Sequence, residues 1–202
     1  MVHGFYPKYI PFCFPSLDKI FCIFTTNLMG DILKEDTKGI LKREFSWRGI
    51  FEVNQEHKDK MIFFDSPAIP YELTADALAT SLWGYPLLIK IADCQPLLIA
   101  HVSQQYIAAF HVGWRANRGG YIMKWVELFC DHYGVKPKDL FAVRGPSLSF
   151  HASEFKNFFT EWSEEYLVYY DATSKNVNLW EITKDQLVKS GLKEQNIFYL
   201  SF

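Results

Sequence analysis

Residues 96–112 read Pro-Leu-Leu-Ile-Ala-His-Val-Ser-Gln-Gln-Tyr-Ile-Ala-Ala-Phe-His-Val, and this stretch decides the fold. It contains two short apolar runs, 96–102 and 105–112, with the polar pair Ser103-Gln104 between them. Runs of this length that are rich in β-branched and aromatic residues are typical of buried strands, and a short polar break between them is typical of a hairpin turn. We therefore expect two strands that lie side by side.

Two chemically active side chains lie beside these strands. Cys94 follows a further strand-like run at 86–92, and His111 lies near the end of the second hairpin strand. Alone, each residue is most simply a core side chain, but Asp93 places a carboxylate next to the thiol. A thiolate and an imidazole on neighbouring strand ends indicate either a metal site or a Cys–His nucleophile pair.

The composition is that of an ordinary globular domain. With 202 residues, 49% hydrophobic and 22% charged, the chain is expected to form a single domain over residues 1–202. A net charge of −2 gives no basic excess for nucleic acid or an anionic membrane, and no run approaches the roughly 20 apolar residues of a membrane span. Four scattered cysteines without a CxxC pair favour a reducing cytoplasm over a disulfide framework.

The rest of the chain mixes predicted strands with predicted helices. Strands are expected at 19–26, 50–53, 61–65, 140–144, 166–170 and 196–201. Helices are expected at 31–46, 118–133, 152–162 and 180–190, with a short helix or a turn at 74–82. Because the elements do not alternate strictly as βαβ units, we predict an α/β (α+β) sandwich with mixed β-sheets and flanking helices.

A metal site needs a third ligand, and His57 is the candidate. The separations between His57, Cys94 and His111 match no local zinc-knuckle pattern, so the fold would have to assemble the site. Two histidines and one cysteine leave a fourth position open for water, which is the arrangement of catalytic zinc. Four other histidines compete for the role: His3, His101, His132 and His151.

A second candidate site follows His111. Arg115 and Arg118 lie beside Gly119-Gly120, where the 118–133 helix is expected to begin. Free N–H groups and the helix dipole favour an anion at such a helix start. The alternative is a pair of solvated surface arginines.

Six motifs in the same order resemble a known family, the laccase-domain proteins. These were first described as multicopper polyphenol oxidases and later as zinc-dependent purine nucleoside phosphorylases with adenosine deaminase activity, and they include peptidoglycan editing factors. The matching stretches are Phe24-Thr25-Thr26-Asn27, Gln55-Glu56-His57-Lys58, Ala75-Asp76-Ala77-Leu78-Ala79-Thr80, Ala92-Asp93-Cys94-Gln95-Pro96-Leu97-Leu98, Ala109-Phe110-His111-Val112-Gly113-Trp114-Arg115-Ala116 and Gly145-Pro146-Ser147-Leu148, with Glu154 where the last motif has glutamate.

The resemblance implies a mixed-sheet fold, a metal site and a substrate. Its metal ligands carry over onto His57, Cys94 and His111, and the expected cofactor is zinc. Cys94 and His111, together with Asp93 and Asp76, form the expected catalytic group, in which the two carboxylates transfer protons or orient the ligands. The expected partners are a purine nucleoside and phosphate, for phosphorolysis at ribose C1′ or deamination at adenine C6, in a monomer or homodimer.

The chain departs from the family pattern at three places. Asn27 stands where the family has arginine, and Lys58 replaces the glycine after the ligand histidine. The sequence ends at Phe202, before the family's arginine-containing C-terminal segment, so we expect a shortened tail. Arg115 and Asn27 are therefore the expected phosphate- or substrate-binding residues, and phosphorolysis is the activity most affected by the missing arginines.

Three other functions remain open. Cys94 could act as a nucleophile with His111 as base in a metal-free hydrolase or deamidase, and His57 would then be dispensable. A non-catalytic paralogue could keep the zinc for stability alone. Copper-dependent phenol oxidation is disfavoured, because six histidines spread along the chain are too few for a multicopper centre.

Overall fold

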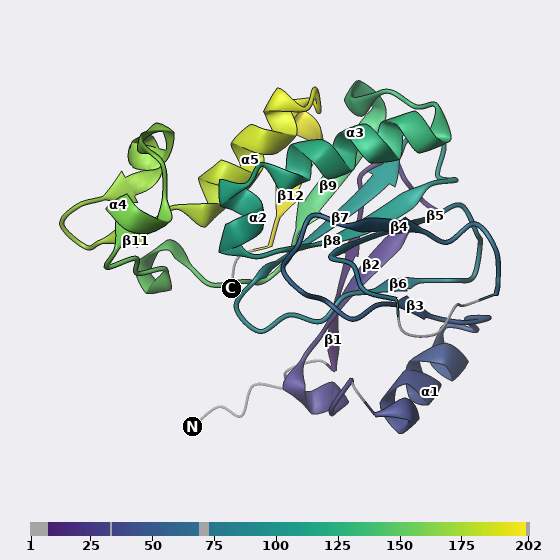
Figure 1. Ribbon diagram of the computed structural model, residues 1–202. Helices are drawn as coiled ribbons and strands as arrows, with labels where there is room; N and C mark the ends of the chain where they lie inside the picture. Colours follow the sequence, from purple (N-terminus) through teal and green to yellow (C-terminus); the bar gives the residue numbers. More distant parts are fainter. Residues whose placement is uncertain (1–7, 33, 69–72, 201–202) are drawn as a thin grey trace.

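The computed structural model describes residues 8–32, 34–68 and 73–200, which are built around a six-stranded mixed β-sheet (Figure 1). In spatial order the strands are β12 (Ile197–Tyr199), β9 (Leu140–Arg144), β7 (Gln95–His101), β8 (Ile107–Val112), β5 (Ala77–Thr80) and β4 (Met61–Phe63). The two outer pairs are parallel and the central pairs are antiparallel. The predicted α/β fold with a mixed sheet and flanking helices is confirmed.

The central hairpin β7–β8 forms as predicted. Leu97 lies opposite Phe110 and Ala100 opposite Ile107 in an antiparallel register. The turn between the strands contains Gln104 in the left-handed region, with φ of 61°. Because both strands have neighbours on each side, they lie in the interior of the sheet, which explains why their sequences are nearly continuous apolar runs.

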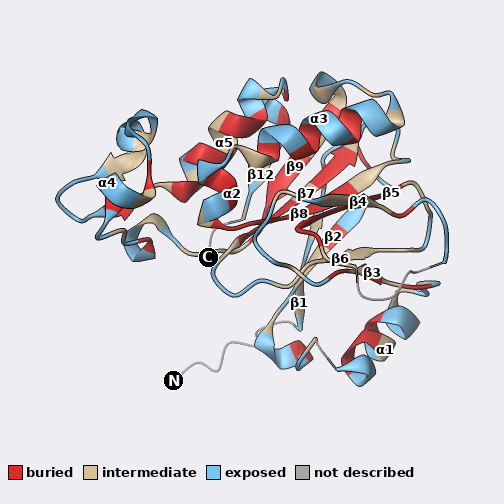
Figure 2. Ribbon diagram, in the orientation of Figure 1, coloured by how far each residue is buried: buried red, intermediate tan, exposed pale blue. Residues whose placement is uncertain are grey.

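Two helices cover one face of the sheet. Helix α3 (Tyr121–Tyr133) buries Trp125 and Phe129 against β-strand residues that include Leu97 and Phe110. The apolar positions of α3 recur at helical spacing, and Gly134 ends the helix in the left-handed conformation that favours glycine. Helix α5 (Leu179–Lys189) lies beside α3, and Figure 2 shows the buried sides of both helices turned toward the buried strands.

The opposite face is covered by two small sheets. The hairpin of β1 (Tyr9–Cys13) and β2 (Phe21–Thr25) contributes a cluster in which Phe14 and Cys22 pack with Val143 and Ala100 of the main sheet. The parallel pair of β3 (Phe51–Glu52) and β6 (Leu87–Leu88) packs Phe51 with Leu78. Helix α1 (Glu35–Glu44) lies beyond these strands (Figure 1). The main sheet is thus buried on both faces.

A small lobe projects from one end of the sheet (Figure 1). It contains α4 (Phe158–Glu161), a 3-10 helix at Glu164–Tyr169 and the hairpin of β10 (Tyr170–Asp171) and β11 (Asn176–Val177). Its own aromatic cluster packs Phe158 and Trp162 with Leu179, the first residue of α5. The lobe therefore joins the main body at the start of α5.

Some predicted elements are wrong. The stretch 74–82 is a strand, β5, because its small side chains fit between β4 and β8, and this pairing overrides the helix propensity of Ala and Leu. Of the predicted 152–162 helix only Phe158–Glu161 is α-helical, since its aromatic side chains fold into the lobe cluster. The predicted strand at 166–170 is mostly a 3-10 helix, with Tyr170 alone extended in a hairpin.

Two boundaries also differ. The predicted strand at 86–92 reduces to β6, which belongs to the small β3–β6 sheet. The predicted 118–133 helix is divided in two: α2 (Trp114–Arg118) ends at Gly119, and α3 starts after Gly120, whose φ of 67° breaks the helix. Within the described ranges, no helix has the length and apolar character that crossing a membrane requires.

Candidate metal centre

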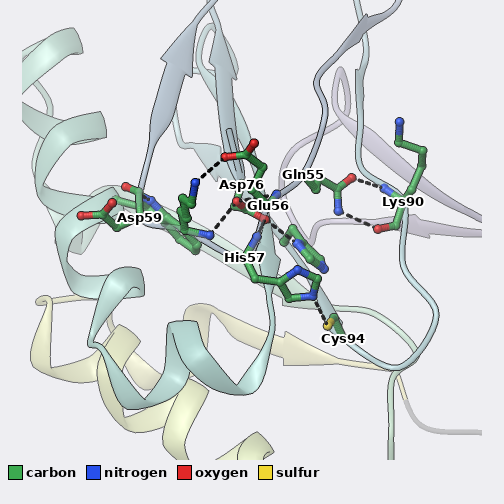
Figure 3. A network of polar contacts seen from close by, with 10 residues as sticks. Gln55, Glu56, His57, Asp59, Asp76, Lys90 and Cys94 are labelled. Atoms are coloured by element: carbon green, nitrogen blue, oxygen red, sulfur yellow. Dashed lines mark hydrogen bonds and ion pairs between the residues drawn. The ribbon is translucent and has the colours of Figure 1, made fainter. Parts of the chain in front are cut away.

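Three side chains from distant parts of the chain meet at one end of the sheet: His57, Cys94 and His111. Their nitrogen and sulfur atoms all lie within 4.8 Å of one another. Cys94 Sγ lies 3.7 Å from Nε2 of His57, and the two imidazole rings meet edge to face at 4.6 Å. Figure 3 shows the side chains of His57 and Cys94 pointing toward each other. His111 is buried, Cys94 is half-buried and His57 is exposed, so the group is open to solvent on one side.

The hairpin brings Cys94 and His111 together. His111 lies opposite Pro96 in the register of β7 and β8, and Cys94 immediately precedes β7. The prediction that both residues lie on neighbouring strand ends is correct, but the prediction that Cys94 terminates a strand at 86–92 is wrong. It lies instead at the start of β7, because an antiparallel partner places the beginning of one strand beside the end of the other.

Asp76 fixes the other two candidate ligands. Its buried carboxylate accepts backbone N–H bonds from Glu56, His57 and Lys58 at 2.8–3.1 Å, and it contacts Nδ1 of His111 at 2.7 Å (Figure 3). The contact with Nδ1 leaves Nε2 of His111 as the nitrogen that can bind a metal. One carboxylate therefore orients the His57 loop and the His111 ring together.

The His57 loop has an unusual backbone conformation. His57 has φ of 60°, a left-handed conformation that costs a non-glycine residue about 1 kcal/mol or more. Lys58, which replaces the glycine of the resembling family, has no positive φ, so a side chain there is tolerated. The three N–H bonds to Asp76 hold the loop in this conformation.

Asp76 also sets the charges of the site. Burial alone would raise the pKa of Asp76, but its hydrogen bonds from His111 and the three backbone N–H groups outweigh burial, and the pKa lies below its ordinary value. Burial alone would lower the pKa of His111, but its contacts with Asp76 and Cys94 raise that pKa to about 9. Burial and the neighbouring His111 lower the pKa of His57.

Gly113 allows the close approach of the ligands. A Cβ atom on Gly113 would lie 2.9 Å from Cδ2 of His57 and 3.3 Å from Sγ of Cys94, which is too close for both. Gly113 is also the residue at which the chain leaves β8 and enters α2. The glycine in this motif therefore serves packing against the site, since its φ of −81° is open to any residue.

The donor set fits a zinc ion. With metal–ligand distances of about 2.0–2.3 Å, tetrahedral zinc separates its ligand atoms by roughly 3.5 Å, close to the 3.7 Å between Cys94 and His57. Two imidazoles and one thiol would leave a fourth position of a tetrahedral metal ion open, as catalytic zinc sites do. The carboxylate behind His111 is the usual partner of a metal-binding histidine.

The other predicted site residues lie at varying positions around this group. Arg115 is exposed, stacks over Trp114 at 4.5 Å and is close enough to lower the pKa of His57. Asp93 is exposed and its carbonyl accepts a bond from Leu148 N–H. Asn27 is exposed in a 3-10 helix after β2, and no contact between it and the three ligands occurs within the described ranges.

Arg118 and the competing histidines have other partners. Arg118 is exposed, and its Nη1 donates a hydrogen bond to the carbonyl of Glu161; the anion site at Gly119-Gly120 stays a prediction. His101 contacts Ser103, and His132 contacts Asp65. His151 is exposed in a 3-10 helix, and His3 lies outside the described residues.

Sequence reasoning missed a buried polar network behind Cys94. Gln95 bonds to Asn117 of α2 and to the carbonyl of Leu179, while Asn117 bonds to Thr183 of α5. Gln186 also bonds to the carbonyl of Asn117. These contacts tie the residue next to Cys94 to both helices. A glutamine at the start of an otherwise apolar strand is the signal that could have revealed it.

The three ligands do not line the large cavity of the molecule. A cavity of about 400 Å³ lies between the second face of the sheet and the small sheets, and its walls include Leu98, Ile89, Phe24 and Trp47. Its lining includes Pro96, which lies opposite His111 in the hairpin, but none of the three candidate ligands. The cavity is lined mostly by apolar side chains, whereas the candidate metal centre is polar.

Known proteins resemble this chain in sequence and in fold. A purine nucleoside phosphorylase of Bacteroides thetaiotaomicron is 30% identical over 127 residues, covering 58% of this chain and 46% of the relative. One from Deinococcus radiodurans is 32% identical over 96 residues, covering 48% and 36%. The chain thus spans less than half the length of these curated relatives.

Solved structures show the same fold. A Neisseria meningitidis protein superimposes with a TM-score of 0.77 at 18% identity, covering 96% of this chain and 86% of that one. YlmD from Geobacillus stearothermophilus gives 0.70 at 19% identity, covering 81% and 67%. The family model described as multi-copper polyphenol oxidoreductase laccase matches residues 35–202, most of the chain, and the protein therefore belongs to this family.

Proposed function

We propose that the protein is a zinc-dependent enzyme of purine nucleosides that carries out phosphorolysis, deamination of adenosine, or both. The observation that carries the proposal is the group of His57, Cys94 and His111, with Asp76 behind it, in a chain whose curated relatives are named purine nucleoside phosphorylases. His57, Cys94 and His111 would hold the metal. A zinc ion held there would supply a Lewis acid that polarises a bound oxygen.

The residues around the candidate ligands have different roles in the proposed reaction. Asp76 keeps Nδ1 of His111 and the His57 loop in place, so it acts as a positioning residue. Asp93 is exposed one residue from Cys94, where it can accept or deliver a proton. Arg115 is exposed at the start of α2 and provides a cation for phosphate or for charge that develops on the substrate.

The two reactions make different demands on these residues. In phosphorolysis, phosphate attacks ribose C1′ as the bond to the purine nitrogen breaks, and the purine leaves with a proton. In deamination, water adds at C6 of adenine and ammonia leaves. Phosphorolysis alone requires a phosphate site, to which Arg115 and the exposed Asn27 are the predicted contributors.

A metal-free alternative rests on one specific contact. Cys94 interacts with the imidazole of His111, so a thiolate–imidazolium pair could form between these two residues, and His57 would be dispensable. Such a hydrolase would keep its activity in the presence of a chelator. A non-catalytic zinc protein would instead lose stability with the metal and show no turnover. Copper chemistry of the multicopper kind needs more histidines than meet here.

The test combines metal analysis with turnover. We expect about one zinc per chain in the purified protein, and turnover of adenosine, or of inosine with phosphate. His57→Ala should lose both metal and turnover. His132→Ala, which removes a histidine that contacts Asp65 far from the site, should keep both. Zinc without turnover would favour the non-catalytic protein, and turnover without metal would favour the hydrolase.

We further propose a cytoplasmic monomer or homodimer. All four cysteines are free thiols, and Cys22 and Cys130 are buried, which suits a reducing compartment. Light scattering of the purified protein would give the oligomeric state.

A further inference from the structure

Arg144 is a buried cation at the end of β9. Its side chain is only 5% exposed, and burial lowers its pKa to about 10. The guanidinium stacks on the ring of Trp180 at 3.9 Å and lies 5.8 Å from the ring of Tyr199. Arginine is rarely buried to this degree without a counter-charge, because the loss of hydration must be offset by an anion.

The described part of the chain gives Arg144 no ion pair. Its two hydrogen bonds run from Nη1 to the carbonyl of Gly145 at 3.4 Å and to Oγ of Ser147 at 3.2 Å. Ser147 Oγ also accepts a bond from Nε1 of Trp180 at 3.1 Å, which fixes the position of the hydroxyl. Glu181 acts on the guanidinium electrostatically, but it makes no ion pair with it.

The remaining N–H donors of Arg144 indicate which kind of ligand could bind it. A guanidinium has five N–H donors in a planar fork, and both hydrogen bonds that Arg144 makes to the described residues start from Nη1. Nε and Nη2 are thus available as a pair, and such a pair matches the oxygens of phosphate or of a carboxylate. The stacked Trp180 ring holds the fork in one plane, so little flexibility is lost when an oxyanion binds.

The loop that follows Arg144 runs along the backbone on both sides of Cys94. Gly145 N–H bonds to the carbonyl of Pro96 at 2.9 Å, and Leu148 N–H bonds to the carbonyl of Asp93 at 3.0 Å. The loop that carries Arg144 and Ser147 therefore runs along residues 93–96 and holds both sides of Cys94. In the sheet, Arg144 lies opposite Leu97, three residues after Cys94.

We propose that Arg144 and Ser147 form an oxyanion site that binds the phosphate of the reaction, an inference that rests on the proposed function. Arg144 binds two phosphate oxygens through Nε and Nη2, and the Ser147 hydroxyl, held by Nε1 of Trp180, orients the guanidinium.

Phosphate binding by the purified, metal-loaded protein tests the site directly. Inorganic phosphate is titrated by calorimetry without nucleoside, at constant ionic strength with chloride as the competing ion. We expect saturable binding that Arg144→Met weakens at least tenfold. Arg144→Lys should weaken it less, since lysine keeps the charge but not the fork. Arg43→Met is the matched control, because it removes an exposed arginine of α1, and it should bind phosphate like the wild type.

Kinetics separate this role from a structural one. Arg144→Lys should raise the KM for phosphate in phosphorolysis and leave kcat and adenosine deamination near the wild-type values. Equal phosphate affinity in the wild type, Arg144→Met and Arg144→Lys would overturn the proposal. If Arg144→Met does not fold, Arg144→Lys and Ser147→Ala decide the question by the same titration.

The same experiments distinguish the two proposals. Phosphate binding that depends on Arg144, in a protein that turns over no nucleoside, would refute the proposed function and keep the oxyanion site. Nucleoside turnover with phosphate binding that is indifferent to Arg144 would refute the oxyanion site alone.

Discussion

Asp76 holds two of the three candidate ligands at once, and its removal should therefore affect both. Asp76→Asn replaces a carboxylate oxygen that faces backbone N–H groups and Nδ1 of His111. We expect metal affinity to fall by roughly 10- to 100-fold, as for other carboxylates behind ligand histidines. Stability should fall by about 1–3 kcal/mol, because buried donors lose their acceptor.

Competition with a chromophoric chelator measures the metal affinity of this variant, and thermal unfolding measures its stability. Asp93→Asn is the matched control, since Asp93 is exposed, and it should keep its metal affinity. Unchanged affinity in Asp76→Asn would mean that the ligands are held by something other than this carboxylate.

Gly113 gives a second prediction for a single residue. In Gly113→Ala the new methyl group would meet Cδ2 of His57 at 2.9 Å and Sγ of Cys94 at 3.3 Å, so the ligands must separate. We expect the protein to fold but to lose most of its metal, as measured by elemental analysis after dialysis.

The control for this variant is Gly39→Ala in the interior of α1. The only atom near its new Cβ is the flexible end of Arg43, at 3.4 Å. Alanine should stabilise that helix by up to about 1 kcal/mol and leave the metal content unchanged. Full metal content in Gly113→Ala would show that the ligands have room to rearrange.

At the level of elements, Asp65 ties the edge of the sheet to α3. Its carboxylate contacts Nε2 of His132, accepts a bond from the Tyr133 hydroxyl at the end of α3, and bonds to Ser81 after β5. Burial alone would raise the pKa of Asp65, but these hydrogen bonds outweigh burial and lower it below its ordinary value.

This pKa predicts an acid-dependent loss of stability. A carboxyl group with a lowered folded-state pKa stabilises the fold above its unfolded-state pKa, and the contribution is lost as the pH falls through the folded-state pKa. Between about pH 5 and pH 3, the free energy of unfolding should therefore fall more steeply for the wild type than for Asp65→Asn. Urea titrations at several pH values measure both slopes, and parallel slopes would contradict the role given to Asp65.

Local sequence pattern predicts some helices and strands of this fold and not others. The hairpin β7–β8, helix α3 with its cap at Gly134, and α5 follow from periodicity and end signals, and all three are present, although α3 starts at Tyr121 and not at residue 118. The conformation of residues 74–82 cannot be predicted from periodicity. It depends on pairing with β4 and β8, which are distant in sequence. The aromatic residues of 152–170 likewise pack as a cluster, and neither helical nor strand periodicity describes them.

Local sequence pattern predicts only part of the candidate site. Cys94 and His111 could be paired from the hairpin alone. His57 was a candidate third ligand among competing histidines, and only the resemblance favoured it over them, because its approach depends on a left-handed backbone and on Asp76, which no local spacing encodes. The sequence does not predict Arg144 as a site residue, because its burial depends on Trp180, which lies 36 positions later in the chain.

At the scale of the whole molecule, we expect the lobe and the main sheet to differ in local stability, because the lobe has a hydrophobic cluster of its own. The lobe at residues 150–178 has short elements and its own aromatic cluster, and it carries exposed apolar residues such as Phe159 and Val168. The sheet has long strands that are covered on both faces. Local opening should therefore release the lobe first.

Hydrogen exchange of the backbone amides measures this difference. Amides of the lobe should exchange faster than those of β7 and β8, and added zinc should slow exchange around His57 without slowing it in the lobe. Equal protection of lobe and sheet would mean that the molecule opens only as one unit.

The hairpin between Cys94 and His111 also has a consequence for the order of events during synthesis. His57, Asp76, Cys94 and His111 all precede α3 and α5 in the chain, so they leave the ribosome before the helices that cover the sheet. Closing a short hairpin is fast, and it brings thiol and imidazole together without any later residue. A nascent chain can thus bring these candidate ligands together while the helices that cover the sheet are still being translated.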